Sequence, residues 1–303
     1  MCGRTCLTLN PKEIQSCCKY KTTPESKPKS PEYRNEFNCG RKYEPSYNIA
    51  PTDLSPVLVS AAHFDEQKDS AERTLVPMMW SMVPRWHKGD YKKHGLTTNN
   101  CRLESLAMSK LYGAPFKAGQ RCIVLSEGFY EWQTTKVLKA SDRPAFFVHM
   151  PQNEKVRMDD KTTWNLKEDG INLLKMAGLF DVWEDENGDK LYSYTVITFE
   201  SNEKFSPIHH RLPAILDTEA DVTAWLDYKR VGANRALNML KPSEAIEWYP
   251  VSSLVNNSSN KSSECNKQIE PGQSQPTTPK SKLMQSWLIV KKRKFDDIDD
   301  DPK

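Results

Sequence analysis

The second residue, Cys2, carries the most unusual chemistry that the sequence offers. Loss of the initiator Met1, which a following residue as small as Cys permits, would leave an α-amine and a thiol on adjacent carbons. The usual pKa values of these groups, roughly 7.7–8.0 and 8.5, leave part of each nucleophile unprotonated near neutral pH. Such a 1,2-aminothiol condenses with an aldehyde to an imine and then closes a thiazolidine ring. The alternative is a frayed terminus without a function.

Two other motifs carry groups that can move protons. Glu131 lies among large aromatic residues in segment 128–132, where burial would raise its pKa into the range useful for general acid–base catalysis. His209 and His210 form an adjacent pair between two prolines, and histidine titrates close to neutral pH. The alternatives are a Glu131 that faces water on an amphipathic strand, and an incidental histidine pair in a loop.

A third group of residues suits a nucleic-acid backbone. Asn100 and Arg102 alternate, so an extended chain presents both side chains on one face. An amide beside a guanidinium fits sugar and phosphate, because Arg donates two hydrogen bonds to phosphate oxygens, and Arg4 would add a second cation. Trp80 and Trp132 are candidates for stacking on unpaired bases, which is worth roughly 1–3 kcal/mol per base. Core packing is the alternative for both tryptophans.

Composition limits the classes of protein to which the chain can belong. The 303 residues carry a net charge of only +3, so any nucleic-acid site must be a local groove. No apolar run approaches the roughly 20 residues of a membrane span, and the polar start does not resemble a signal peptide, so we expect a soluble chain that is not secreted. The eight cysteines include no paired C-x-x-C elements, so we expect no metal, no cofactor and mostly reduced thiols.

Many short strands and few helices position these groups. The pattern predicts an α+β, β-rich domain with a twisted antiparallel sheet or half-closed barrel and peripheral helices. Asn187-Gly188 predicts a hairpin between two of the strands. The domain is expected to span residues 2–257, and the Ser-, Asn- and Pro-rich residues 258–303 are expected to form a disordered tail. The expected strands are 56–60, 121–125, 144–149, 173–180 and 192–199, segment 75–86 also contains strand-like apolar residues, and the expected helices are 11–20, 105–108, 217–228 and 233–240.

Six motifs in a fixed order resemble those of the SOS response-associated peptidase (SRAP) family. The likeness covers about residues 2–257. Two positions depart from the family pattern, namely Ser81, where Gly is expected, and Leu212, where Met is common. Neither position belongs to an expected catalytic group. The motifs are residues 1–4, 47–51, 80–86, 100–102, 128–132 and 209–213.

The resemblance implies an enzyme that forms a covalent thiazolidine link between Cys2 and the C1′ aldehyde of an abasic site in single-stranded DNA. It implies that Glu131 transfers protons, that His209 promotes opening of the sugar ring, and that Asn100 holds the terminus or the sugar. It further implies a monomer that needs no cofactor and acts in the nucleus at replication forks. The implied DNA contacts are Arg4, Arg102, Arg211, Trp80, Trp132, Asn48 and Thr198.

Two features beyond the domain and two rival functions remain open. The basic run 291–294 is compatible with nuclear import or with a solvated charge cluster, and segment 281–288 is a weak candidate for docking on a replication clamp. One rival is a cysteine peptidase that uses Cys2, His209 and either Asn100 or Glu131, acting on proteins or on whatever precedes Cys2. The other rival is a non-catalytic reader of modified bases in duplex DNA.

Overall fold

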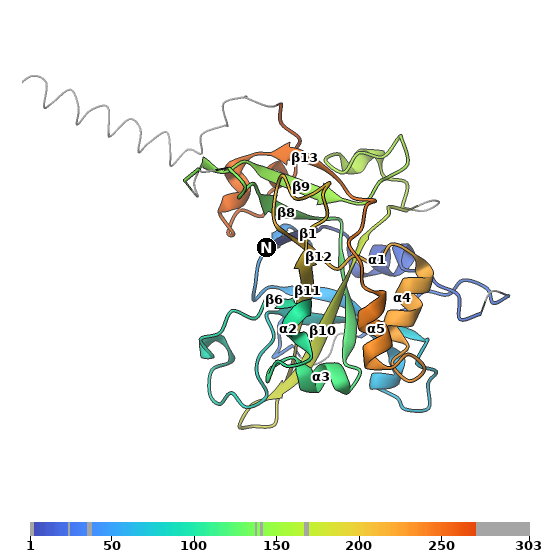
Figure 1. The fold of residues 1–303 in the computed structure, drawn as a ribbon. Coiled ribbons are helices and arrows are strands. Elements are labelled where there is room, and N and C mark those ends of the chain that lie inside the picture. The colour runs from blue at the N-terminus through green and yellow to red at the C-terminus, as the bar shows by residue number, and fades with distance from the viewer. Residues whose placement is uncertain are drawn as a thin grey trace, which may run out of the picture.

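The computed structural model describes residues 3–23, 25–34, 38–136, 138–139, 142–166 and 170–270. These residues form two β-sheets that meet along one side, with short helices around them (Figure 1). Within those ranges, none of the helices has the length and apolar character that crossing a membrane requires. The α+β, β-rich class predicted from the sequence is confirmed.

The larger sheet closes into a barrel of five strands. Strand β11 pairs with β10 on one side and, in parallel, with β5, where Ser193 lies opposite Met79 and Tyr194 opposite Trp80. That parallel contact closes the path β11–β10–β7–β4–β5 on itself, which confirms the half-closed barrel. Strands β4, β5 and β7 are buried along their whole length, as expected for a closed sheet with outer elements. The barrel strands are β4 (Leu54–Ser60), β5 (Arg73–Trp80), β7 (Arg121–Ser126), β10 (Leu174–Glu184) and β11 (Lys190–Glu200).

Three short strands extend the barrel at its rim. Strands β6 and β12 both pair with the second half of β11, β6 in parallel and β12 antiparallel, while β2 pairs with the start of β5. The shared neighbour β11 brings two motifs that are far apart in the sequence to one end of the barrel. These strands are β2 (Glu32–Tyr33), β6 (Asn100–Arg102) and β12 (Arg211–Pro213).

The smaller sheet is antiparallel throughout, in the order β13–β9–β8–β1–β3. In Figure 1, strands β13, β9, β8 and β1 lie above β10 and β11 of the barrel. Strand β1 lies inside this sheet, with Arg4 opposite Tyr130 and Thr5 opposite Phe129. The N-terminal strand is therefore held between two neighbours. The strands are β1 (Arg4–Leu7), β3 (Ser46–Ile49), β8 (Gly128–Trp132), β9 (Ala145–His149) and β13 (Glu247–Val251).

The two sheets are joined covalently where β7 runs into β8. Only Glu127 separates the barrel strand from the strand of the smaller sheet. The next residue must be a glycine, because a Cβ on Gly128 would lie 2.2 Å from the Phe147 ring. The close approach of that ring to the backbone sets the point at which the chain changes sheet, and hence the direction of β8.

The helices are short and peripheral, and their ends follow from local sequence. Helix α1 (Pro11–Cys17) begins with Asn10 as N-cap and a capping box to Glu13, which explains why the sequence identified its start. Helix α4 (Glu219–Leu226) packs on the barrel, where the Trp225 indole N–H donates to the Cys122 carbonyl. The other helices are α2 (Leu103–Leu106), α3 (Gly113–Lys117) and α5 (Ala233–Met239). Helix α2 begins and ends earlier than expected.

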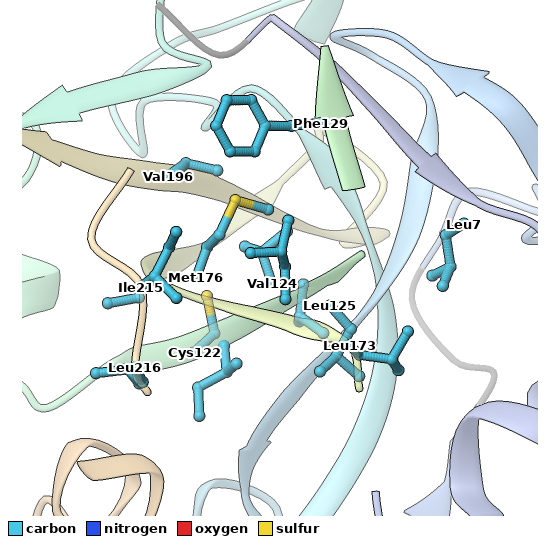
Figure 2. Packing of buried hydrophobic residues seen from close by; sticks show 14 of the residues in the cluster. Leu7, Cys122, Val124, Leu125, Phe129, Leu173, Met176, Val196, Ile215 and Leu216 are labelled. Carbon is cyan, nitrogen blue, oxygen red and sulfur yellow. The ribbon is translucent and has the colours of Figure 1, made fainter. Parts of the chain in front are cut away.

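The hydrophobic core fills the barrel and continues under the smaller sheet. Figure 2 shows Val124, Met176 and Val196 from β7, β10 and β11 packed against one another, with Phe129 of β8 above them. The side chains of Ile215 and Leu216, which follow β12, close the same cluster from another side. Continuous packing from one sheet to the other fixes their relative position, and the candidate site lies along that junction.

Residues 252–270, here called the C-terminal strap, fold back across the smaller sheet. The buried Asn48 amide nitrogen donates to the carbonyls of Val255, Asn257 and Asn260 at 3.2, 3.1 and 3.0 Å. Cys265 of the strap is fully buried. Residues 258–270, which the sequence assigned to the tail, are therefore packed against the domain. The rest of that segment, including the basic run 291–294, lies outside the described residues.

Candidate functional site

Glu131 and His209 face each other at the junction of the two sheets. Glu131 lies on β8 and His209 in the loop before β12, and the His209 Nε2 atom is 4.0 Å from the Glu131 Oε1 atom. Both side chains are buried, at 3% and 5% exposure. The Thr134 N–H donates to the Ile208 carbonyl at 3.0 Å, which ties the end of β8 to the loop directly before the histidine. The pair is therefore held by the backbone on both sides.

Burial shifts both titrating groups of this pair towards their neutral forms. It raises the pKa of Glu131 from 4.5 to about 7 and lowers that of His209 from 6.5 to about 4. His209 Nδ1 lies 2.9 Å from the Arg211 backbone nitrogen and 3.2 Å from the Arg211 carbonyl oxygen, so the Arg211 backbone offers Nδ1 a partner in either neutral tautomer. In the tautomer in which the Arg211 N–H donates to Nδ1, the ring carries its proton on Nε2, the nitrogen that faces Glu131. Near neutral pH the site thus holds a neutral imidazole beside a carboxyl group that is close to half-protonated.

Arg211 lies beside this pair with its guanidinium inside the protein. Its NH1 and NH2 atoms donate to the two carboxylate oxygens of Glu104 at 2.7 and 3.0 Å. NH2 also donates to the Thr198 carbonyl at 2.7 Å and to the Thr198 hydroxyl at 3.3 Å. Thr198, predicted as a DNA contact, is fully buried and holds Arg211 in place.

An open cavity of about 400 Å³ lies next to the buried pair. Arg102 and the exposed His210 are on its wall, and the His210 ring stacks on His209 with centroids 4.4 Å apart. Residues of the rim strands β6 and β12 and of the loop that carries the histidines line the cavity. Its lining residues are Arg102, Glu200, Ser201, Ser206, His210 and Arg211. Two arginines, two serines and a histidine, together with the acidic Glu200, thus line an opening of a size suited to part of a nucleotide.

The strap holds Arg4 and Trp132 at the other side of Glu131. Arg4 donates to the Val255 carbonyl at 3.0 Å, and the Trp132 indole N–H donates to Asn256 Oδ1 at 2.7 Å. The Arg4 guanidinium lies 6.0 Å from the centre of the Trp132 ring, within the range of a cation–π contact. Both side chains remain half-buried, so part of each faces solvent beside β8.

A buried carboxylate fixes the far end of β1. Glu127 Oε1 accepts hydrogen bonds from the Thr8 N–H, the Thr8 hydroxyl and the Leu9 N–H at 2.6, 2.7 and 3.1 Å. Its Oε2 atom accepts from the Cys6 thiol at 3.3 Å. This carboxylate therefore locks the register of the strand that leads back to the N-terminal residues.

The structure brings some predicted site residues together and separates others. Asn100 is on β6, with Tyr112 OH donating to its carbonyl at 3.4 Å, whereas Cys2 lies outside the described residues. Trp80 is fully buried, donates to the Asn99 carbonyl and stacks on Tyr194, so stacking on a base would require this part of the core to open. Asn48 is also buried, and its amide nitrogen donates to the Val255 carbonyl of the strap rather than facing a ligand.

The architecture and the sequence agree with one family. Residues 1–258 match the family model described as SOS response associated peptidase (SRAP). The chain belongs to this family. The abasic site processing protein HMCES of Xenopus tropicalis is similar, with 41% identity over 301 residues that cover 97% of this chain and 87% of that protein. The abasic site processing protein YoqW of Bacillus subtilis is 31% identical over 234 residues, which cover 76% of this chain and 89% of its own.

Solved structures support the same fold for this SRAP chain. A protein of Bacteroides thetaiotaomicron, determined by X-ray crystallography, superimposes with a TM-score of 0.63. The superposition covers 89% of this chain and 100% of that one at 16% identity, so it shows the fold alone. Among the residues that the model describes, no group of three His, Cys, Asp or Glu side chains is arranged to hold a metal ion.

Sequence reasoning missed three groups that shape the SRAP site. Glu104 was read only as part of a helix start, although it lies two residues after Arg102 and pairs with Arg211. Glu127 was passed over because nothing local shows that its carboxylate is buried. Asn256 was read as the end of the domain. The signal in the sequence is that Glu104 and Glu127 lie close to motif residues. The sequence does not distinguish such carboxylates, which bind other groups of the protein, from charged surface residues.

Proposed function

We propose that this chain processes abasic sites in single-stranded DNA by forming a covalent thiazolidine link through Cys2. The observation that carries the proposal is the buried Glu131–His209 pair beside the cavity, at 4.0 Å, with a pKa of about 7 for the carboxyl group. It offers an acid–base group and, in the tautomer with the proton on Nε2, an N–H donor at the place where an aldehyde would react. The HMCES and YoqW relatives, both named as abasic site processing proteins, support an abasic site as the substrate.

Chain connectivity supports Cys2 as the nucleophile. Arg4 lies opposite Tyr130 in the smaller sheet, and Tyr130 is the residue before Glu131. Cys2 is two residues before Arg4, and a chain of two residues spans at most about 8 Å between Cα atoms, since consecutive Cα atoms are 3.8 Å apart. Glu127 and the strap hold β1 from Arg4 onward in a single register. We therefore propose that the α-amine and thiol of Cys2 react next to Glu131.

The proposed reaction releases one water and needs no oxidant or reductant. The His209 Nε2–H donates to the sugar oxygen and favours the open-chain aldehyde. The Cys2 amine adds to C1′, and protonated Glu131 supplies the proton with which the C1′ hydroxyl leaves as water. The resulting carboxylate takes the thiol proton, the thiolate attacks the imine carbon, and the C–S bond closes the thiazolidine. Glu131 ends protonated, as it began.

The remaining residues are assigned to binding. Arg102 and Arg211 on the cavity side, and Arg4 on the other side of Glu131, are proposed to hold phosphates that flank the abasic sugar. Asn100 is proposed to hold the sugar or the terminus, and the half-exposed Trp132 to stack on a neighbouring base. We further propose that the protein acts as a monomer on nuclear DNA at replication forks, where it protects the abasic site. Segment 281–288 is proposed as the place where a replication clamp would dock.

The decisive experiment mixes purified protein with a single-stranded oligonucleotide that carries one abasic site. The N-terminus is first checked by mass spectrometry, and products are run on a denaturing gel beside Cys2→Ala and a version that retains Met1. A heat-stable shifted band from the wild type alone is the expected result. Absence of the band, with a free Cys2 terminus confirmed, would overturn the proposal.

The same preparation separates the two rival functions. Acetylation of the α-amine abolishes the band under the proposed mechanism, because the imine needs that amine, whereas the thiol of a peptidase would remain active. A reader of modified bases would bind duplex DNA reversibly, with base preference and without need of Cys2. Either of these results would replace the covalent mechanism.

A further inference from the structure

Glu104 occupies the position at which a phosphate would meet Arg211. The ion pair is a two-point contact, with NH1 to Oε1 at 2.7 Å and NH2 to Oε2 at 3.0 Å. This is the same parallel geometry that Arg uses for phosphate oxygens. The motif makes Arg211 the expected phosphate-binding residue of the cavity. Its two terminal nitrogens, however, already donate to the carboxylate of Glu104.

Exposure shows from which side an external anion can arrive. The Arg211 side chain is only 7% exposed, whereas that of Glu104 is 52% exposed. The inner side of the guanidinium donates to the Thr198 carbonyl, and the Arg211 Nε atom is buried. A phosphate therefore reaches the donors of Arg211 by taking the place of the Glu104 carboxylate.

We propose that Glu104 is an internal competitor of DNA, and that a backbone phosphate displaces it from Arg211 when single-stranded DNA binds. The proposal rests on the proposed function only in taking single-stranded DNA as the ligand. Glu104 is the second residue of helix α2, and its side chain is half-exposed. It can therefore rotate into solvent without opening the core. Thr198 continues to hold the guanidinium during the exchange.

The exchange makes undamaged DNA bind loosely at this point. The hydrogen bond from Arg211 lowers the pKa of Glu104, so the carboxylate stays charged at neutral pH and competes there at full strength. Replacing one anion by another adds little net affinity, and the counterion that the phosphate releases is offset by the cations that the freed Glu104 carboxylate attracts. In wild type the salt dependence of binding should therefore lack the increment of about 0.7 that a single-strand phosphate contact adds to the slope. Long residence on DNA would then come from the covalent step.

The rival interpretation makes Glu104 a support for Arg211. In that case the ion pair persists in the complex and fixes the guanidinium for a phosphate that binds elsewhere in the cavity. The two interpretations predict opposite signs for loss of the carboxylate. A competitor weakens DNA binding, so its removal tightens the complex, whereas a support strengthens binding, so its removal loosens the complex.

The test measures fluorescence anisotropy of a labelled oligonucleotide without an abasic site, over a range of salt concentrations. The variant Glu104→Gln is compared with Glu200→Gln, which removes the same charge from a cavity residue that lies opposite Arg211 across β11 and β12 but leaves the Arg211–Glu104 hydrogen bonds in place. We expect Glu104→Gln to bind about fivefold more tightly than Glu200→Gln, with a salt slope steeper by about 0.7. Adding Arg211→Gln to Glu104→Gln should remove both gains.

The outcomes that would overturn the proposal are equally specific. Weaker binding of Glu104→Gln than of Glu200→Gln makes Glu104 a support, and equal binding shows that Glu104 does not compete with DNA. A gain that survives Arg211→Gln comes from the loss of a negative charge in general and not from release of Arg211. Thermal melts of every variant exclude unfolding as the cause. Undamaged DNA cannot crosslink, so this result is independent of the denaturing-gel assay, and failure of the covalent mechanism is distinguishable from failure of the competitor.

Discussion

Two buried carboxyl groups bracket strand β8, and they serve different purposes. Glu127 precedes the strand, Glu131 lies near its end, and both side chains are almost inaccessible to solvent. Glu127 is surrounded by donors from β1 and the residues that follow it, two of them backbone N–H groups. Glu131 faces an imidazole next to an open cavity. Only three residues separate a structural carboxyl group from a candidate catalytic one.

The comparison teaches that burial alone does not make a carboxyl group reactive. Burial raises the pKa of both carboxyl groups, and the hydrogen bonds from Thr8 and Cys6 to Glu127 oppose that rise only in part. Glu127 is held by donors on both oxygens, whereas Glu131, with a pKa of about 7, faces an imidazole beside the cavity. The surroundings of each group, and not its burial, therefore separate the carboxyl group that holds β1 from the one that is placed to exchange a proton with a ligand.

The largest expected effect is loss of chemistry in Glu131→Gln. The amide keeps the size of the side chain but cannot transfer a proton, so the rate of crosslinking to an abasic oligonucleotide should fall about 10²- to 10⁴-fold. Single-turnover time courses on denaturing gels measure this rate. The thermal midpoint should not fall, and a rate within a factor of three of wild type would show that the comparison assigns the wrong carboxyl group.

The second effect is loss of stability in Glu127→Gln. An amide nitrogen would meet the donors that now face an oxygen, so we expect the free energy of unfolding to fall by about 2–3 kcal/mol. Urea denaturation at pH 7 reports this as a lower midpoint. If stability is unchanged, the hydrogen bonds to Thr8 and Leu9 do not hold β1, and the structural half of the comparison fails.

The third effect is a pH dependence of stability, to which Glu127 also contributes because burial raises its pKa, so the Glu131 part is taken from the difference between wild type and Glu131→Gln. The pKa of Glu131 is raised in the folded state, so its contribution to stability is complete below about pH 4.5 and is lost as pH rises through about 7. Between pH 5 and 8 the wild type should therefore lose stability relative to Glu131→Gln, by up to about 3 kcal/mol. His209, whose pKa is lowered to about 4, acts in the opposite sense, with its contribution lost as pH falls from about 6.5.

Because His209 is present in both proteins, the difference between wild type and Glu131→Gln isolates the carboxyl group. Urea midpoints at several pH values provide that difference. A difference that stays flat from pH 5 to 8 would mean that Glu131 titrates in its usual range, and the rate of crosslinking would then lack an inflection near pH 7.

The smallest effect concerns the end of β8 that meets the strap. Asn256→Ala removes the acceptor of the Trp132 indole N–H, a partly exposed bond, so we expect a loss of about 0.5–1 kcal/mol and a crosslinking rate reduced about two- to fivefold. The exposed strap residue Ser259 provides the matched control as Ser259→Ala. Equal effects of both substitutions would show that the hydrogen bond to Asn256 does not position the Trp132 side chain.

Local signals in the sequence were sufficient for most elements of the fold. The capping box at Asn10 and Glu13 marks α1, and Asn187-Gly188 lies in the connection between β10 and β11. Closure of the barrel rests on a parallel contact between β5 and β11, more than 110 residues apart, and no local pattern encodes that contact. The class was predictable because strand composition is local, whereas the pairing of particular strands is not.

The site was predictable as a set of motifs and not as a geometry. Nothing in segment 128–132 or around His209 shows that the two side chains meet, because packing of a loop against β8 decides it. The same limit applies to Trp80, whose indole is in the core rather than in an accessible groove. The composition of residues 258–270 predicts a tail, but the hydrogen bond from the Asn48 amide to the Asn260 carbonyl and the buried Cys265 side chain hold this segment on the domain, and composition does not show such long-range contacts.

The strap also determines when the site can exist during protein synthesis. Arg4 and its acceptor at Val255 are 251 residues apart, and Asn48 and its acceptor at Asn260 are 212 apart. At about 5–20 residues per second, a ribosome needs roughly 12–50 s to make the stretch between Arg4 and Val255. During that time β1 has left the ribosome without its last partners. An incomplete nascent chain therefore carries the N-terminal strand but not the finished site.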